Sequence, residues 1–279
     1  MSEAPVLFDR ALYLRRLARA RRDEPDPLSR AVAAEFAGRL DLVNRRFDRV
    51  LIIAPDPRPF AEIAAASGKV REIVRRLPPA GDDLDLDPAS LDALFDMLDL
   101  HAVNDVPGRI AQGARALRPD GLFAACLLAG GSLTELRQSW LAAEDQVRGG
   151  ASPRVAPMAS VRELGALLQR VGLALPVADL DRTLLRYSDA LALIHEISRL
   201  GMGNVLAGRA RRPVSRRLLG AAVSHYREHF SDEDGRVRAT LELAWLTGWA
   251  PHHSQQQPLK PGSARARLAD ALKVPEVKL

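Results

Sequence analysis

Short apolar runs that alternate with amphipathic stretches constrain the fold of this chain most. Residues 49–54 (RVLIIA) form a β-branched run closed by Pro55, and residues 122–128 (LFAACLL) follow a Pro-Asp-Gly turn. Runs this short are typical of strands buried inside a parallel sheet. The stretches between them, such as residues 59–67 and 105–117, have helical patterns. This alternation predicts an α/β fold with helices on both faces of a mostly parallel sheet.

The two ends of the chain differ from this central region. Residues 8–22 and 28–44 carry helical patterns, separated by an Asp-Glu-Pro-Asp-Pro breaker. Beyond residue 250 the sequence is polar and contains several prolines, which favours an extended segment. We therefore predict an N-terminal helical arm over residues 1–48, an α/β domain with helical insertions over residues 49–250, and an extended polar tail over residues 251–279.

Two helix starts are predicted in the second half of the domain. Ser132 with Glu135, and Ser160 with Glu163, have the spacing of a capping box, in which the serine and the glutamate each bond the other's backbone N–H. Other patterns predict strands at residues 70–74, 91–98, 173–180 and 237–249, and helices at residues 188–200 and 213–230.

Length and composition limit the class of protein. The chain has 279 residues, of which 47% are hydrophobic and 27% charged, so it has ample material for a folded core. Its single cysteine, Cys126, lies inside an apolar run and cannot form an internal disulfide. No apolar run approaches the roughly 20 residues that span a bilayer, and the first 20 residues lack the apolar core of a signal peptide. These features predict a cytoplasmic protein.

Charge is unevenly distributed along the chain. Residues 77–108 contain eight aspartates and no Lys or Arg, whereas residues 198–227 contain seven arginines and no acid. Both segments are open to interpretation as solvated surface. The basic segment alternatively forms a face for an acidic protein partner or for the inner face of an anionic membrane. Nucleic acid is disfavoured, because aromatic residues make up only 5% of the chain. The arginines predicted for this face are Arg209, Arg211, Arg212, Arg216 and Arg217.

Several motifs occur together in an informative order. Residues 91–108 (LDALFDMLDLHAVNDVPG) and 117–123 (LRPDGLF) resemble the fourth strand, and the turn into the fifth, of class I S-adenosylmethionine (SAM)-dependent methyltransferases. The second motif is common in that superfamily and identifies nothing narrower. More specific motifs follow at residues 133–137 (LTELR), 149–153 (GGASP), 201–203 (GMG), 232–235 (DEDG) and 248–255 (GWAPHHSQ).

The complete set resembles a methyltransferase-like family that includes a mitochondrial complex I assembly factor acting as a protein arginine hydroxylase. More distantly, it resembles the malonyl-carrier-protein O-methyltransferase of biotin synthesis. The resemblance implies an α/β, Rossmann-like class I methyltransferase fold with an N-terminal helical arm and a C-terminal helical elaboration. It also implies SAM as the cofactor, methylation or arginine hydroxylation as the activity, and a complex I subunit as a partner.

The turn after the first strand departs from the pattern that this resemblance implies. The superfamily carries acid-x-Gly-x-Gly-x-Gly there, because the backbone must approach the cofactor closely. Here Ala54 replaces the acid, and residues 55–59 contain three prolines and no glycine, which removes three backbone donors. After the second strand, Val74 is followed by two arginines where a ribose-binding acid is implied, and arginine accepts no hydrogen bond. The sequence therefore predicts a degenerate SAM-binding site.

Some side chains remain candidates for that site. His101 and Asn104 follow the fourth-strand motif at the edge implied to face cofactor and substrate, so they are the candidate catalytic residues; the alternative for His101 is a structural role. Asp56 could bend back to replace the missing acid. Asp82 or Asp83 could meet the adenine, or could belong to a solvated acidic loop. The candidate cofactor-binding residues are Ala54, Asp56, Asp82, Asp99 and His101.

No metal site is predicted. His225 and His229 have the i, i+4 spacing of helical metal ligands, but the pattern indicates no third ligand. The sequence thus predicts a methyltransferase-family protein with a degenerate SAM loop, similar to the arginine hydroxylase. The alternative is a non-catalytic pseudo-methyltransferase that serves as a binding or assembly module, and whether the chain is an enzyme is left open.

Overall fold

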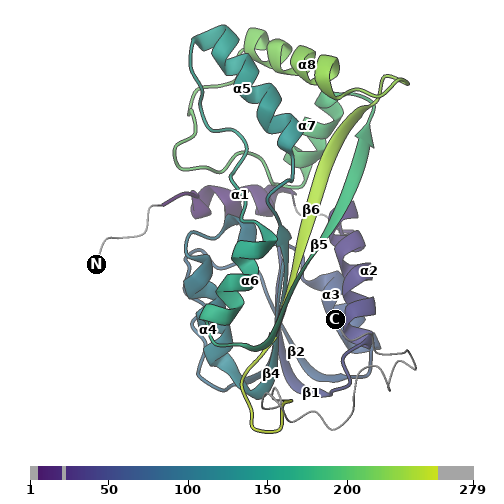
Figure 1. The fold of residues 1–279 in the computed structure, drawn as a ribbon, viewed down its shortest axis with the longest axis vertical. Helices are drawn as coiled ribbons and strands as arrows, with labels where there is room; N and C mark the ends of the chain where they lie inside the picture. Colours follow the sequence, from purple (N-terminus) through teal and green to yellow (C-terminus); the bar gives the residue numbers. More distant parts are fainter. Residues whose placement is uncertain (1–5, 21–22, 257–279) are drawn as a thin grey trace, which may run out of the picture.

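The computed structural model describes residues 6–20 and 23–256. Its centre is a six-stranded sheet in the order β2-β1-β3-β4-β6-β5. The first four strands are parallel, and β6 and β5 are antiparallel to their neighbours. The predicted α/β class is therefore confirmed (Figure 1). The strands are β1 (Phe47–Ile53), β2 (Val70–Arg76), β3 (Leu91–Met97), β4 (Leu117–Leu128), β5 (Ala174–Tyr187) and β6 (Val237–Trp249).

Helices cover both faces of the sheet, as the sequence predicts. On one face, Phe36 of α2 packs edge-to-face on Phe60 of α3 and on Phe95 of β3, with ring centroids 5.9 Å and 5.0 Å apart. On the other, Ile110 of α4 and Leu164 of α6 join a second buried cluster. The helices are α1 (Arg10–Ala20), α2 (Pro27–Asp41), α3 (Arg58–Ala66), α4 (Val106–Ala116), α5 (Thr134–Arg148), α6 (Val161–Arg170), α7 (Ala190–Arg199) and α8 (Arg216–Phe230), with one 3-10 turn, η1 (Leu100–Ala102).

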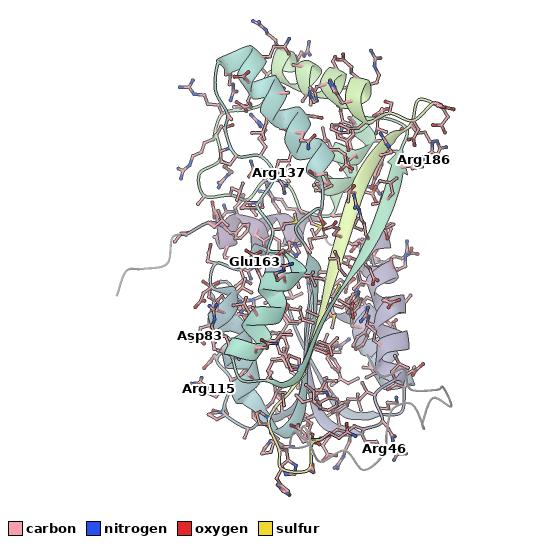
Figure 2. The ribbon with its side chains drawn as sticks, in the orientation of Figure 1. Arg46, Asp83, Arg115, Arg137, Glu163 and Arg186 are labelled. Atoms are coloured by element: carbon pink, nitrogen blue, oxygen red, sulfur yellow. The ribbon has the colours of Figure 1, made fainter. Side chains whose placement is uncertain are left out.

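The two last strands extend beyond the rest of the sheet. Residues 243–249 of β6 pair with β4, whereas residues 237–242 pair with β5 alone. This two-stranded ribbon carries α5, α7 and α8, which pack with it around a separate core that includes Trp140 and Tyr226 (Figure 1). At the far end of the ribbon, Arg186 binds Asp232 and Asp234 (Figure 2). The predicted C-terminal helical elaboration is therefore this helical layer on the ribbon.

The segment between β2 and β3 is a loop. Residues 77–90 form no helix or strand, so β2 is the edge of the sheet. The loop brings the Asp82 carboxylate to the backbone N–H of Asn104, just beyond η1.

The two predicted capping boxes have opposite outcomes. Ser160 and Glu163 cap α6 reciprocally, as predicted. The prediction at Ser132 is wrong, because α5 begins at Thr134 after Leu133, whose φ of 55° is left-handed. The Ser132 hydroxyl instead donates to the backbone oxygen of Glu242 at 2.9 Å. Glu135 accepts hydrogen bonds from the N–H and hydroxyl of Thr240, so pairing with β6 replaces the local cap.

Among the described residues, no helix is long and apolar enough to cross a membrane. Most of the predicted tail, residues 257–279, lies outside the described part of the chain, so its extended conformation stays a prediction.

Candidate functional site

The candidate site lies at the carboxyl ends of β1 and β3, two neighbouring parallel strands of the sheet. The chain leaves β1 towards β2 on one side, while β3 lies on the other, which makes this point the topological switch of the sheet. In open α/β sheets, ligands bind at such a point, outside the carboxyl ends of the strands. The segments that meet here are the turns after β1, β2 and β3, together with α1 of the N-terminal arm.

The polar groups of the turn after β1 are already bonded by nearby residues of the chain. Ala54 is fully buried, and its N–H donates to the backbone oxygen of Arg76 at 3.3 Å. The Asp56 carboxylate accepts from the backbone N–H, Nε and a terminal nitrogen of Arg58 at 3.1, 2.9 and 2.7 Å. The Asp56 carboxylate is therefore engaged by the neighbouring guanidinium instead of being presented to a cofactor amine.

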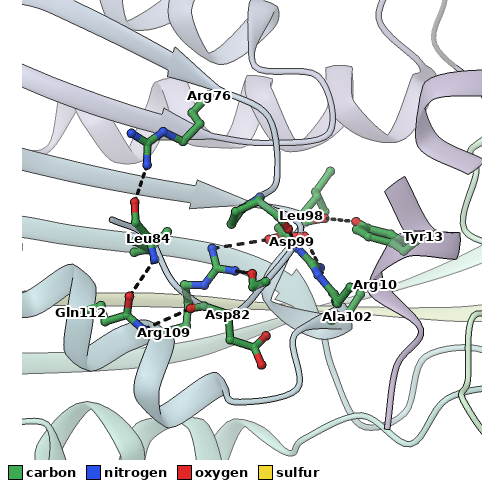
Figure 3. Close-up of polar contacts among 12 residues, drawn as sticks. Arg10, Tyr13, Arg76, Asp82, Leu84, Leu98, Asp99, Ala102, Arg109 and Gln112 are labelled. Carbon is green, nitrogen blue, oxygen red and sulfur yellow. Dashed lines mark hydrogen bonds and ion pairs between the residues drawn. The ribbon is translucent and has the colours of Figure 1, made fainter. Parts of the chain in front are cut away.

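The segment after β2 also lacks the implied ribose-binding acid. Arg76 ends this strand and donates to the backbone oxygen of Leu84 at 2.5 Å (Figure 3). Asp82 accepts from the backbone N–H of Asn104 at 3.3 Å, and its backbone oxygen accepts from Gln112. These bonds tie the acidic loop to η1 and α4.

The centre of the site is an ion pair between α1 and the turn after β3. The Arg10 guanidinium donates to the Asp99 carboxylate at 2.8 and 3.2 Å, and also to the backbone oxygens of Ala102 and Pro79 (Figure 3). The Asp99 side chain is fully buried and that of Arg10 is only 5% exposed. Burial lowers the pKa of Arg10, but Asp99 outweighs this effect and raises it overall. The pair is therefore shielded from water.

Two further groups surround this pair. Arg109 of α4 is buried, donates to the backbone oxygen of Gly81 at 3.1 Å and has a terminal nitrogen 4.0 Å from Asp99. Asp96 of β3 is 1% exposed, and neither of its carboxyl oxygens has a hydrogen-bond partner. Burial, and then the charge of Asp99, raise the pKa of Asp96 well above its ordinary value, against the opposing effects of Arg109 and Arg10. Its burial therefore disfavours the charged form of Asp96.

We expect Asp96→Asn to stabilise the fold in a pH-dependent way. With a raised folded pKa, Asp96 contributes most to stability below its unfolded pKa and loses this contribution as pH rises towards the folded pKa. The free energy of unfolding of the variant relative to the wild type should therefore increase from pH 4 to pH 7.5, measured by urea unfolding. Asp92→Asn is the matched control, because Asp92 binds Arg118 and the backbone N–H of Arg49. An Asp96→Asn difference that is the same at both pH values contradicts this assignment.

The two candidate catalytic residues have contrasting surroundings. Asn104 fastens the arm: its side-chain oxygen accepts from the backbone N–H groups of Leu7 and Phe8 at 2.9 and 2.7 Å, and its amide donates to the Phe8 oxygen. His101 is half-buried with a shielded, unpartnered Nδ1, and burial lowers its pKa to about 4. A neutral imidazole can act as a base, whereas Asn104 has no spare capacity on its amide oxygen.

SAM does not fit this arrangement in the position that the resemblance implies. The turn after β1 has prolines instead of glycines, and the Asp56 carboxylate is held by Arg58. Arg10 occupies the space between the turns that follow β2 and β3, where it bonds to both. Tyr13, 1% exposed, lies beside it with its hydroxyl 3.4 Å from the Leu98 oxygen. The chain's own side chains therefore fill the carboxyl ends of these strands.

An accessible cavity lies on the other side of α1. It has a volume of about 550 Å³ and is bounded by α1, the start of α2, the turn after β1, the end of β5 and α7. Its wall includes Pro55 and Asp56, so it adjoins the switch point. The charged and aromatic side chains that line it include Glu24, Arg30, Tyr187, His195, Glu196 and Arg199.

The helical histidines form a stacked pair instead of the beginning of a ligand set. The rings of His225 and His229 are 4.1 Å apart and nearly parallel. Their Nδ1 atoms contact Ser139 and the backbone oxygen of His225, respectively. No group of three or more His, Cys, Asp or Glu side chains is arranged to hold a metal in the part of the chain that the structure describes.

Two groups of known proteins are similar to this chain in sequence. The chain is 34% identical to the mitochondrial arginine-hydroxylase NDUFAF5 of Danio rerio over 185 residues, which are 66% of this chain and 57% of the relative. The chain is a homologue of NDUFAF5. It is also 30% identical to the malonyl-(acyl-carrier protein) O-methyltransferase of Laribacter hongkongensis over 202 residues, 70% of this chain and 64% of that protein. Both relationships predicted from the sequence motifs are confirmed.

The structural comparison confirms the class I methyltransferase fold. A candidate methyltransferase from Bacillus halodurans C-125 superposes with a TM-score of 0.52 over 79% of this chain and 99% of that one, at 11% sequence identity. No family model matches the sequence. The chain spans less than two thirds of the length of NDUFAF5 from Danio rerio and of the Laribacter enzyme. The activities in the names of these relatives are therefore statements about the relatives and are not carried over to this chain here.

Sequence reasoning missed the residues at the centre of the site. Arg10, Tyr13 and Arg109 were not candidates, although Arg10 lies in the N-terminal Phe-Asp-Arg segment, residues 8–10. The only available signal was an arginine in that segment together with an unusually acidic fourth-strand motif, residues 91–108.

Proposed function

We propose that this NDUFAF5 homologue is a methyltransferase-fold assembly factor that binds an arginine-bearing segment of a protein partner without carrying SAM at the usual position. The observation that carries the proposal is that the chain's own side chains fill the switch point: Arg10 bonds the turns after β2 and β3, and Tyr13 reaches Leu98, while the turn after β1 has no glycine. The accessible space next to it is the 550 Å³ cavity between α1, α2 and α7. The name of the NDUFAF5 relatives supplies arginine as the group to be recognised.

The chemistry of the cavity supports a cationic guest. Glu196 and Glu24 supply carboxylates, and Tyr187 supplies an aromatic ring, which together suit a guanidinium on an aliphatic stem. Burial, and then Glu196, raise the pKa of Tyr187, so its hydroxyl stays neutral beside that carboxylate. The side chains of Glu24 and Arg30 are 88% and 56% exposed, so their 3.8 Å contact is free to rearrange around a guest.

Two titrations test this function. We expect SAM to bind the wild-type protein with a Kd far above the low-micromolar range, which corresponds to about −8 kcal/mol. We expect an arginine-containing peptide from the partner to bind at least about tenfold more tightly than the same peptide with citrulline, because citrulline keeps the shape and loses the charge. Calorimetry measures both, and Glu196→Gln should remove the preference for arginine.

Glu228→Gln is the matched control, because Glu228 is an exposed carboxylate on α8 outside the cavity. Low-micromolar SAM binding to the wild type would sink the proposal. Equal affinity for the two peptides would do the same for the arginine-binding part. Mass-spectrometric detection of methylation or hydroxylation on the peptide would instead establish the enzymatic alternative, which the names of both relatives favour.

A basic face is proposed as the wider contact for a partner with an acidic surface, such as a complex I subunit. Arg211, Arg212, Arg216 and Arg217 are exposed, and they have no ion pair within the described chain. Arg209 differs from them because it binds Asp9 at 2.9 Å and is largely buried. This face therefore consists of four arginines, those at positions 211, 212, 216 and 217.

Reversing these four arginines to glutamate should weaken association with the partner at least about tenfold at low salt while leaving the fold intact, since exposed substitutions typically cost under about 0.5 kcal/mol each. Co-precipitation with complex I subunits measures the association, and circular dichroism checks the fold. The same reversal at Arg162 and Arg170, exposed on α6, is the control. Unchanged association of the fourfold variant would assign these arginines to solvated surface. Sedimentation with anionic vesicles tests the predicted location at the inner face of a membrane.

A further inference from the structure

The Arg10 guanidinium is surrounded by hydrogen-bond acceptors in the way that a bound ligand would be. Each of its two terminal nitrogens makes two hydrogen bonds, to Asp99 and Ala102 for one and to Asp99 and Pro79 for the other, at 2.8–3.2 Å. Its guanidinium also lies 5.0 Å from the centre of the Tyr13 ring. Two parallel bonds to one carboxylate are the arrangement that distinguishes guanidinium from ammonium.

The acceptors and the donor come from different parts of the molecule. Asp99, Ala102 and Pro79 belong to the turns after β3 and β2, which are parts of the α/β body. Arg10 comes from α1, 89 residues away from Asp99 in sequence. The arm reaches this place through its own attachments, since Asn104 binds the backbone of Phe8, and Asp9 binds Arg209 at 2.9 Å. The acceptor set is therefore a property of the body, and Arg10 is brought to it.

We infer that the turns after β2 and β3 form a guanidinium-binding site for which Arg10 is the internal, tethered ligand. The fully buried Asp99 supplies the charge, and the backbone oxygens of Ala102 and Pro79 supply directed acceptors on either side of it. Arg109 does not replace Arg10, because its nearest nitrogen is 4.0 Å from Asp99, beyond hydrogen-bond distance. Removing the Arg10 side chain therefore leaves a charged, unfilled position that selects planar, forked cations.

This inference rests on the proposed absence of SAM from its usual position. It names the Arg10 guanidinium as the group that occupies that position instead. It is independent of whether the neighbouring cavity binds a partner's arginine. The two can fail separately, because one concerns a small cation in an Arg10 variant and the other concerns SAM and peptides on the wild type.

Chemical rescue tests the inference. Arg10→Ala should unfold at a lower temperature than the wild type, and ethylguanidinium should raise that temperature, whereas ethylammonium at equal concentration should not. At ten times its Kd, a ligand stabilises the folded state by about 1.4 kcal/mol, or roughly 2–4 °C in a protein of this size. The wild type should show no such rise, because Arg10 already fills the site. The double variant Arg10→Ala with Asp99→Asn should lose the response.

If the Arg10→Ala variant does not fold, the inference can still be tested by refolding. Refolding it in millimolar ethylguanidinium should then restore native circular dichroism where ethylammonium does not. Arg10→Lys, which keeps a cation on the arm, should also respond to ethylguanidinium, since one ammonium cannot make the paired bonds to Asp99. The inference is overturned if ethylguanidinium and ethylammonium act alike on Arg10→Ala, or if the double variant responds as strongly as the single one.

Discussion

Replacing Asp99 with alanine should lower the free energy of unfolding by about 3–5 kcal/mol, the usual cost of removing one partner from a buried ion pair. The substitution leaves two buried guanidinium groups, those of Arg10 and Arg109, without their shared carboxylate. Each would then bear the cost of an unpaired charge away from water. Urea unfolding followed by circular dichroism measures the change.

The control replaces both members of the pair with apolar residues of similar size. Arg10→Met with Asp99→Leu removes the charges together, so it should cost much less than the single change. Comparing the single and the double variant separates the free-energy cost of an unpaired buried charge from the cost of lost packing. A single variant no less stable than the double variant would mean that water reaches this cluster and that the pair is not shielded.

Replacing Trp245 with alanine should cost about 3–5 kcal/mol, as expected for a large aromatic removed from a core. Trp245 lies in the middle of β6 and is 2% exposed. Its ring also supports the Arg39 guanidinium of α2 at 4.4 Å, and Arg39 in turn binds Asp179 of β5 at 2.7 Å. The loss should therefore include the attachment of α2 to the edge of the sheet as well as the packing of the indole.

Trp249→Ala is the comparison, because Trp249 is a half-buried residue at the end of the same strand. It should cost clearly less in the same urea unfolding experiment. Arg39→Met separates the two parts of the Trp245 effect, because it keeps the aliphatic contact and removes the ion pair. Equal losses at Trp245 and Trp249 would contradict the central position of Trp245.

Much of the sheet could be predicted because its strands are set by local composition. The run at residues 91–98 became β3 (Leu91–Met97), which is buried along its whole length and, apart from Asp92 and Asp96, carries apolar side chains on both faces. Residues 237–249 match β6 (Val237–Trp249). Even the degenerate turn after β1 was predictable, since proline and glycine determine backbone geometry wherever they occur.

Local rules failed where distant strands competed for the same side chains. Ser132 and Glu135 have the spacing of a cap, but their hydrogen bonds go to Glu242 and Thr240 of β6, more than 100 residues away. The same reason hid the centre of the site. Nothing in the sequence near Arg10 indicates a carboxylate 89 residues on, or that Asn104 would hold the arm beside it.

The ribbon formed by the outer parts of β5 and β6 has a mechanical consequence. Over residues 237–242 the helical layer of α5, α7 and α8 is joined to the sheet by only two strands, and a pair of strands twists more readily than a wide sheet. A second attachment exists where the Arg16 side chain of α1 reaches the backbone of Asn204 just beyond α7. Torsion of the ribbon about this anchor changes the separation of α7 from α2. We therefore expect a load on the outer helices to alter the width of the 550 Å³ cavity, because α7 and the start of α2 both line it.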